Sequence, residues 1–127
     1  MPLIELIALL AVFQYLFFGY LVGGQRRDSG LKAPTMTGHD GFERMYRVQM
    51  NTLECIVAFL PLLFLAGKYW PPVLVALVGC VYLVGRTIYC RAYFKEPSTR
   101  GLGFMLTLAS IALLFVLALL GLIIALF

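Results

Sequence analysis

The residues best suited to chemistry form a stripe of polar side chains within a largely apolar stretch. Four of them recur at intervals of three or four residues: Arg44, Arg47, Asn51 and Glu54. This spacing places them on one face of a helix, whereas Gln49 points elsewhere. A charge at membrane depth costs at least about 2.5–3.5 kcal/mol, so such a stripe persists only where it has partners or a function. It therefore indicates either ion pairs between helices or a ligand site.

A second stripe follows later in the chain, where Arg86, Tyr89 and Tyr93 are spaced by three and four residues. Two tyrosines near a helix end are typical of a membrane-interface belt. Arg100, beyond Pro97, would on its own be an anchor at the membrane surface. Each of these features therefore has a purely structural interpretation when it is taken alone.

Taken together, the arginines outnumber the carboxylates around these stripes. The arginines are Arg26, Arg27, Arg44, Arg47, Arg86 and Arg100, and the carboxylates are Glu43 and Glu54. Guanidinium groups bind carboxylates bidentately, Glu54 can meet an ammonium group, and the amides of Gln49 and Asn51 can satisfy amides of a ligand. We therefore expect an anionic ligand, and a small peptide with two carboxylates and one amino group fits these residues.

The amino-acid composition indicates that these stripes belong to a membrane protein. Of the 127 residues, 62% are hydrophobic and 13% are charged, against about 45–50% and about 25% in a soluble domain. The net charge of +4 comes from dispersed Lys and Arg residues, which do not form the run that nucleic acid requires. Cys55, Cys80 and Cys90 lie in apolar stretches without metal-like spacing, so we expect small buried hydrophobes, no disulfide framework and no metal site.

Hydropathy predicts one all-α domain, an integral membrane four-helix bundle over residues 1–127. Its helices are expected at about residues 3–22, 40–66, 72–95 and 99–126. Residues 23–34 are expected to form a polar loop and residues 67–70 a short turn, while Ser98 or Thr99 is expected to cap the last helix. We interpret the first stretch as a retained helix and His39 as solvated surface.

The basic residues predict how the bundle lies in the membrane. They concentrate around the first and third loops, and only Lys68 lies at the second. The positive-inside rule places loops 1 and 3 in the cytoplasm and both termini on the opposite side. Either a bacterial inner membrane or the endoplasmic reticulum membrane satisfies this topology.

One motif resembles a known family: Phe42-Glu43-Arg44-x-Tyr46-Arg47-x-Gln49-x-Asn51-x-x-Glu54. It is similar to the second-helix motif of the MAPEG proteins (membrane-associated proteins in eicosanoid and glutathione metabolism). The closest branch is that of cysteinyl-leukotriene synthase and the microsomal glutathione S-transferases. The resemblance continues from Gly79 to Tyr93, then at Arg100 and at the pair Arg26-Arg27, and it covers essentially the whole chain.

The resemblance implies a homotrimer with a glutathione site at each subunit interface, near the cytosolic side. Arg100 would face the glutathione sulfur, and Arg27 would assist proton transfer on the side of the electrophile. The implied function is a glutathione transferase that uses glutathione as co-substrate and attacks a lipophilic electrophile or a lipid hydroperoxide delivered by membrane lipid. The residues expected to hold the tripeptide are Arg26, Arg47, Gln49, Asn51, Glu54, Arg86, Tyr89 and Tyr93.

Two positions depart from the leukotriene synthase pattern. Cys55 stands where that enzyme has a tyrosine, and Ala112 stands where it has a tryptophan over the lipid tail, so leukotriene synthesis is not inferred. One alternative is a non-catalytic lipid-binding scaffold of the same fold, which should lack the thiolate arginine, whereas this chain keeps Arg100. The other is a small four-helix multidrug transporter, which would need a carboxylate deep in the first helix, whereas Glu5 lies at the helix edge.

Overall fold

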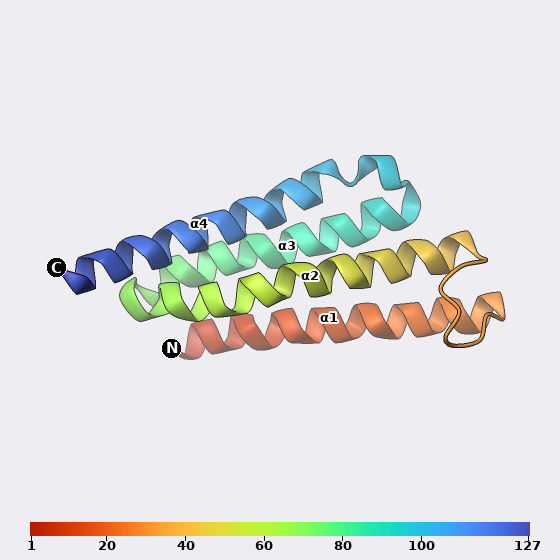
Figure 1. The fold of residues 1–127 in the computed structure, drawn as a ribbon, viewed down its shortest axis with the longest axis horizontal. Coiled ribbons are helices and arrows are strands. Elements are labelled where there is room, and N and C mark those ends of the chain that lie inside the picture. Colours follow the sequence, from red (N-terminus) through yellow and green to blue (C-terminus); the bar gives the residue numbers. More distant parts are fainter.

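Four long helices make up almost the whole chain, and the computed structural model describes all residues from 1 to 127. They are α1 (Pro2–Ser29), α2 (Asp40–Tyr69), α3 (Pro72–Lys95) and α4 (Gly101–Leu126), with a 3-10 turn η1 (Pro97–Thr99) between the last two (Figure 1). Every one of the four helices is long and apolar enough to cross a membrane. The predicted all-α, four-span fold is therefore confirmed.

The helices run up and down beside one another (Figure 1). Both termini lie at one end of the bundle, whereas the α1–α2 loop and η1 lie together at the other end. Consequently the N-terminal turns of α2 and α4 are at the same end as the C-terminal turns of α1 and α3. The basic ends of several helices are thereby gathered at one end of the molecule.

The first helix is longer than predicted, because it does not stop near Val22 but continues to Ser29. Residues 23–29, expected in a loop, are therefore helical, and Arg26 and Arg27 occupy the last helical turn. Cations are favoured there by the helix dipole. The helix ends where Gly30 adopts a left-handed conformation with φ 74°, which a glycine accepts without steric cost.

Two further boundaries differ from the prediction. The second helix continues through Gly67 to Tyr69 instead of turning after residue 66, since Ile4 of α1 packs directly against Gly67. Neither Ser98 nor Thr99 caps α4, because both lie in η1 and the Thr99 hydroxyl donates to the backbone oxygens of Ala92 and Glu96. The helix instead begins at Gly101 without any side-chain cap.

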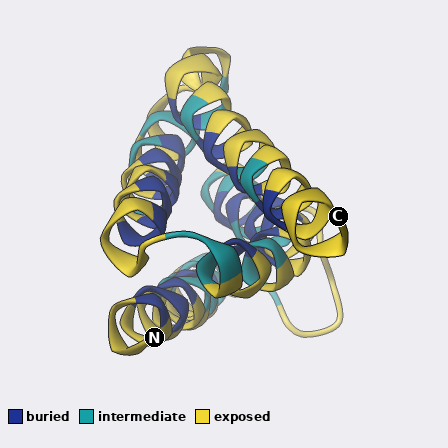
Figure 2. Ribbon diagram, turned by 90° about the vertical axis from the view of Figure 1, so that its left-hand side faces the viewer, coloured by how far each residue is buried: buried dark blue, intermediate teal, exposed yellow.

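The outer faces of the bundle are apolar. Buried positions face inward between the helices, and exposed positions cover the outside (Figure 2). The exposed residues include many Leu, Val, Ile and Phe side chains from all four helices, such as Leu9, Val57, Leu77 and Ile124. An apolar outer surface of this kind is stable in hydrocarbon, because the backbone polar groups are hydrogen-bonded inside each helix.

A polar layer crosses the bundle between two apolar clusters. The larger cluster lies towards the termini and includes Phe59 stacked on Tyr82, with their ring centroids 3.8 Å apart. The smaller cluster lies near the loop end and includes Phe42 and Tyr89. Along α2, α3 and α4, the buried polar residues lie between the residues of these two clusters. They are Asn51, Thr52, Arg86, Thr107 and Ser110.

Candidate functional site

Arg86 is the centre of the polar layer. It is fully buried, at 0% exposure, yet its hydrogen-bond partners are all neutral. Its Nη1 donates to Asn51 Oδ1 at 2.7 Å, and its Nε donates to Thr107 Oγ1 at 3.0 Å. Its Nη2 has no partner. The guanidinium also lies over the Tyr89 ring, 4.3 Å from the centroid, where the negative ring face attracts a cation.

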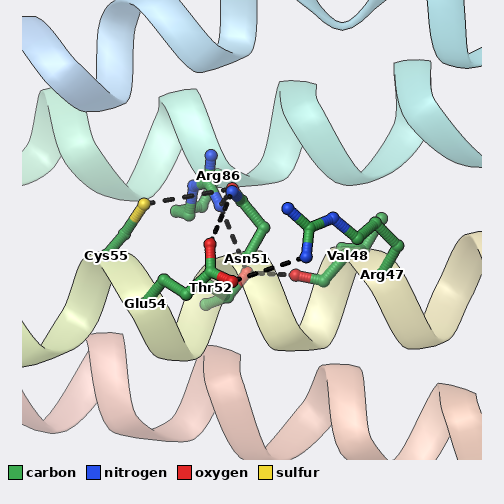
Figure 3. Close-up of polar contacts among 7 residues, drawn as sticks. All are labelled: Arg47, Val48, Asn51, Thr52, Glu54, Cys55 and Arg86. Atoms are coloured by element: carbon green, nitrogen blue, oxygen red, sulfur yellow. Dashed lines mark hydrogen bonds and ion pairs between the residues drawn. The ribbon is translucent and has the colours of Figure 1, made fainter.

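A chain of polar contacts leads from Arg86 towards the surface (Figure 3). Because Asn51 Oδ1 is engaged by Arg86, the Asn51 amide nitrogen is left to donate to Glu54 Oε2 at 3.4 Å. The other carboxylate oxygen, Oε1, meets Arg47 Nη1 at 3.4 Å. This is the chain's only ion pair, and its side chains are 52% and 59% exposed. Such a pair adds little stability and its groups remain available to a ligand.

Arg47, Asn51 and Glu54 line a groove of about 900 Å³, within the range typical of ligand sites. The groove, called here the α2–α4 groove, lies between α2, the end of α3, η1 and α4. Its loop end is polar, and its deeper end, around Ala58 and Ile111, is apolar. The lining residues are Arg47, Asn51, Glu54, Cys55, Ala58, Tyr89, Tyr93, Ser98, Arg100, Gly101, Phe104, Met105, Leu108 and Ile111.

The aromatic side of the groove comes from α3 and the start of α4. Tyr89 and Tyr93 stack with their centroids 5.5 Å apart, and Phe104 lies 6.5 Å from Tyr89 at a tilt. Tyr89 is nearly buried, whereas Tyr93 is half-buried. The two rings form a flat surface opposite the polar stripe of α2, against which an extended peptide can lie.

Arg100 stands at the polar end of the groove, immediately before α4. Its only hydrogen bond is from Nη1 to the Pro97 backbone oxygen at 3.3 Å, within its own turn. The side chain is exposed and no carboxylate pairs with it. Its charge is thus free to act on a group that enters the groove.

Four of the predicted site residues do not line the groove: Arg86 is fully buried in the polar layer, and the other three lie on the α1 side of α2. Gln49 faces α1, where its amide approaches Gly19 so closely that a Cβ there would touch it. Arg26, at the end of α1, donates to the Thr35 backbone oxygen at 2.7 Å and lies 4.5 Å over the Phe42 ring. Arg27 is exposed on the same helix end. Within one chain, the predicted residues therefore divide between the groove, the buried polar layer that holds Arg86, and the α1 side of α2.

Arg44 also does not lie in the groove with the other residues of the predicted stripe. Its Nη1 donates to the backbone oxygens of Phe94 and Lys95, both at 3.2 Å, so it binds the C-terminal end of α3. This contact lies next in sequence to Tyr93, which lines the groove. Arg44 therefore connects two walls of the groove and does not line it.

Sequence reasoning missed other residues of the site region. Thr107 holds Arg86, and Ser98 and Phe104 line the groove. A signal for Thr107 was present, since it and Ser110 are the only hydroxyl residues of an otherwise apolar helix. His39 is not merely solvated surface, because its Nδ1 accepts from the Phe42 backbone N–H and caps α2.

Comparisons with known proteins agree with this geometry. The profile of the MAPEG family matches residues 4–120. Microsomal glutathione S-transferase 2 of Mus musculus is 36% identical over 119 residues, covering 94% of this chain and 81% of the relative. Leukotriene C4 synthase of Bos taurus is 34% identical over 120 residues, covering 94% and 80%. An uncharacterised protein of Synechocystis is 41% identical over 116 residues, covering 91% and 85%.

The match spans all four helices and includes every residue of the groove. Relatives above 30% identity cover most of the chain and include named glutathione transferases. The four membrane-length helices and the polar groove agree with this assignment. The chain is a member of the MAPEG family, an integral membrane protein of its glutathione-related branch.

Proposed function

We propose that this protein is a glutathione transferase whose α2–α4 groove binds glutathione and presents its sulfur to Arg100. The observation that carries the proposal is the groove's charge pattern. It offers Arg47 and Arg100 at its mouth against a single carboxylate, Glu54. Glutathione has two carboxylates and one ammonium group, which complement this pattern.

The α2 wall supplies the peptide-binding groups. Arg47 can bind a carboxylate bidentately, and Glu54 can accept the ammonium group once the ligand displaces their mutual ion pair. Asn51 presents its amide N–H groups, because its oxygen is held by Arg86. The stacked tyrosines would then carry the peptide backbone on the opposite wall.

Arg100 is the proposed activating group. A free thiol has a pKa near about 8.5, and lowering it by about two units requires roughly 2.7 kcal/mol of preferential thiolate stabilisation. A guanidinium about 4 Å away can supply that amount, because the attraction is about 4 kcal/mol at the effective dielectric constant near a protein surface. The thiolate sulfur would then form a bond to an electrophilic carbon. In a substitution the bond from that carbon to the leaving group breaks and the group departs with the electron pair, whereas in an addition the resulting anion takes a proton, with Arg27 proposed to assist.

The apolar end of the groove is suited to the second substrate. Ala58, Leu108 and Ile111 continue from the polar end towards the bilayer centre. A lipophilic electrophile could enter there from the membrane. A lipid hydroperoxide would fit the same space: thiolate attack on its O–O bond would release an alcohol, and a second glutathione would yield the disulfide and water.

The homotrimer is part of this proposal. Arg26, Arg27 and Gln49 lie on the α1 side of α2, away from their own groove. If three copies form a ring, this side of one subunit can face the groove of the next, and each site would draw residues from two chains. With loops 1 and 3 in the cytosol, the polar end of every groove would open towards it.

A difference absorbance spectrum tests the function directly. Glutathione added to the detergent-purified protein should produce a thiolate band at neutral pH, whereas S-methylglutathione, which has no ionisable thiol, should produce none. Turnover with chloro-dinitrobenzene should accompany the band. Binding of glutathione without a band or turnover would favour the lipid-binding scaffold. The transporter is not supported, since Glu5 lies in the first turn of α1.

A further inference from the structure

The closest approach between α3 and α4 occurs directly behind the groove, at Gly103. A Cβ at this position would contact the Tyr89 backbone nitrogen and would lie 2.6 Å from Tyr89 Cα and 2.8 Å from the Gly85 backbone oxygen. All three are backbone atoms, which cannot rotate away as a side chain can. Any side chain at position 103 must therefore push the two helices apart.

Gly85 extends this contact on the α3 side. A Cβ on Gly85 would lie 3.0 Å from the backbone nitrogen of Thr107 and 3.0 Å from Leu106 Cβ. This second contact is tight but less severe than the first. The paired glycines also allow Thr107 to reach Arg86, since its hydroxyl accepts from Arg86 Nε at 3.0 Å and donates to the Gly103 oxygen at 2.8 Å.

The contact adjoins Arg100, the group proposed to act on the thiol, and Tyr89, which is proposed to carry the peptide. Gly103 follows Arg100 by one helical turn, and Phe104, the next residue, lies against Tyr89 in the groove. Few polar contacts fix the start of α4: it has no side-chain cap, Arg100 bonds only within its own turn, and the nearest side-chain bonds to α3 are those of Thr99 to Ala92 and of Arg86 to Thr107. The height and direction of the first turn of α4 therefore depend on how closely Gly103 meets Tyr89.

From these contacts we propose that Gly103 is a positioning residue, whose close approach to Tyr89 sets the distance between the Arg100 guanidinium and the sulfur of bound glutathione. The inference rests on the proposed function. Gly103 touches no substrate, because it is buried and does not line the groove. Its effect reaches the thiol through the placement of α4 alone.

The expected effect of Gly103→Ala follows from Coulomb's law. Moving Arg100 from about 4 to about 5 Å from the sulfur weakens the attraction by about a fifth, which raises the apparent pKa of the bound thiol by about half a pH unit. Because a thiol lowered by about two units from about 8.5 is mostly ionised at neutral pH, its thiolate fraction and turnover there should fall by about a third, and turnover below pH 6 should fall about threefold. Glutathione affinity should change little, because Arg47, Asn51 and Glu54 stay on α2.

The test is a pH titration of the thiolate band, with turnover and glutathione affinity, in Gly103→Ala, Gly85→Ala and Gly121→Ala. Gly121 is the matched control, since it lies on the same helix at the far end of the bundle and packs as closely against Tyr69. We expect a raised thiol pKa in Gly103→Ala, a smaller rise in Gly85→Ala and none in Gly121→Ala.

An unchanged thiol pKa and turnover in folded Gly103→Ala would overturn the inference. If Gly103→Ala does not fold, Gly85→Ala decides by the same criteria, and an unchanged pKa there is equally contrary. An equal rise in Gly121→Ala would assign the effect to general loosening of the bundle. Absence of a thiolate band in the unmodified protein would instead overturn the proposed function, and this inference with it.

Discussion

Two arginines with different surroundings lie at the mouth of the groove. Arg47 shares the polar wall of α2 and already meets Glu54, whereas Arg100 has no charged partner and stands at the start of α4. A charge held by a carboxylate is matched to a zwitterionic ligand. An unpaired charge is matched to an anion that forms during the reaction. Substitutions of Arg47 and of Arg100 should therefore impair different properties of the protein.

Arg100→Ala should lower turnover, whereas Arg47→Ala should weaken glutathione binding. Loss of a charge that acts mainly on the thiolate lowers turnover with chloro-dinitrobenzene by about 10- to 100-fold, or roughly 1.4–2.7 kcal/mol. Truncating one partner of a charge pair with the ligand costs about 2–5 kcal/mol of binding. Steady-state kinetics and glutathione titration separate these effects. Unchanged turnover and an unchanged thiolate band in Arg100→Ala would remove Arg100 from the mechanism.

Arg86 is the one charged side chain among the buried residues, and it has no carboxylate partner. A buried charge of this kind is costly, and that cost offsets the stability lost when Asn51 and Thr107 are left without their donor. We expect Arg86 to orient the Asn51 amide, because Arg86 Nη1 donates to Asn51 Oδ1 at 2.7 Å. The loss of Arg86 should therefore affect ligand binding more than stability.

Arg86→Met is accordingly expected to change the melting temperature in detergent little while raising the glutathione dissociation constant about tenfold, or roughly 1.4 kcal/mol. Thr107→Val is the matched control, because it removes the acceptor of Arg86 Nε and leaves the bond to Asn51 in place. It should alter affinity less. Unchanged glutathione affinity in Arg86→Met would show that the orientation of Asn51 does not depend on Arg86.

At the scale of the helices, the spans could be predicted from the sequence but some of their ends could not. Apolar stretches of about 20 residues locate a span because the bilayer core requires that length. The end of α1 depends instead on Gly30 in a left-handed conformation. Gly30 lies seven residues beyond Gly23, the residue at which the polar loop was expected to begin. The continuation of α2 depends on packing between Gly67 and Ile4, which are far apart in sequence.

The polar stripe of α2 could also be predicted only in part, because some of its contacts are with residues far away in the sequence. Helical spacing correctly placed Arg47, Asn51 and Glu54 along one groove. It could not show that Arg44 turns to the end of α3, because that partner is a pair of backbone oxygens 50 residues or more away. Nor could it place Thr107, whose role depends on the close approach of α4 to α3.

Arg44 should act on the junction between α2 and α3, not on chemistry. Its guanidinium binds two free carbonyl oxygens at the last turn of α3, where a cation also meets the negative end of the helix dipole. Arg44→Ala should cost about 1.5–3 kcal/mol of stability. Hydrogen exchange should quicken in the last turn of α3, and Arg44→Lys should restore part of the loss. Protection equal to that of the unmodified protein would contradict this role.

At the scale of the whole molecule, the groove of one chain is an incomplete match to the predicted set of glutathione-binding residues. Arg26 and Gln49 lie on the opposite side of α2 and reach no ligand in their own groove. A ring of three subunits would bring this side of one chain to the groove of its neighbour. The apolar outer faces of the bundle allow such packing within the membrane as readily as contact with lipid.

Mixing two inactive variants should therefore restore activity if each site is shared between subunits. Arg100→Ala damages the groove and Arg26→Ala damages the opposite side, so each homomeric variant should lose most of its turnover. In randomly mixed trimers, about a quarter of the interfaces would join an intact groove to an intact Arg26, and turnover should recover to about that fraction. Native mass spectrometry checks that mixed trimers have formed. Mixed trimers no more active than the average of the two parents would place the whole site within one chain, and full activity of Arg26→Ala alone would remove Arg26 from it.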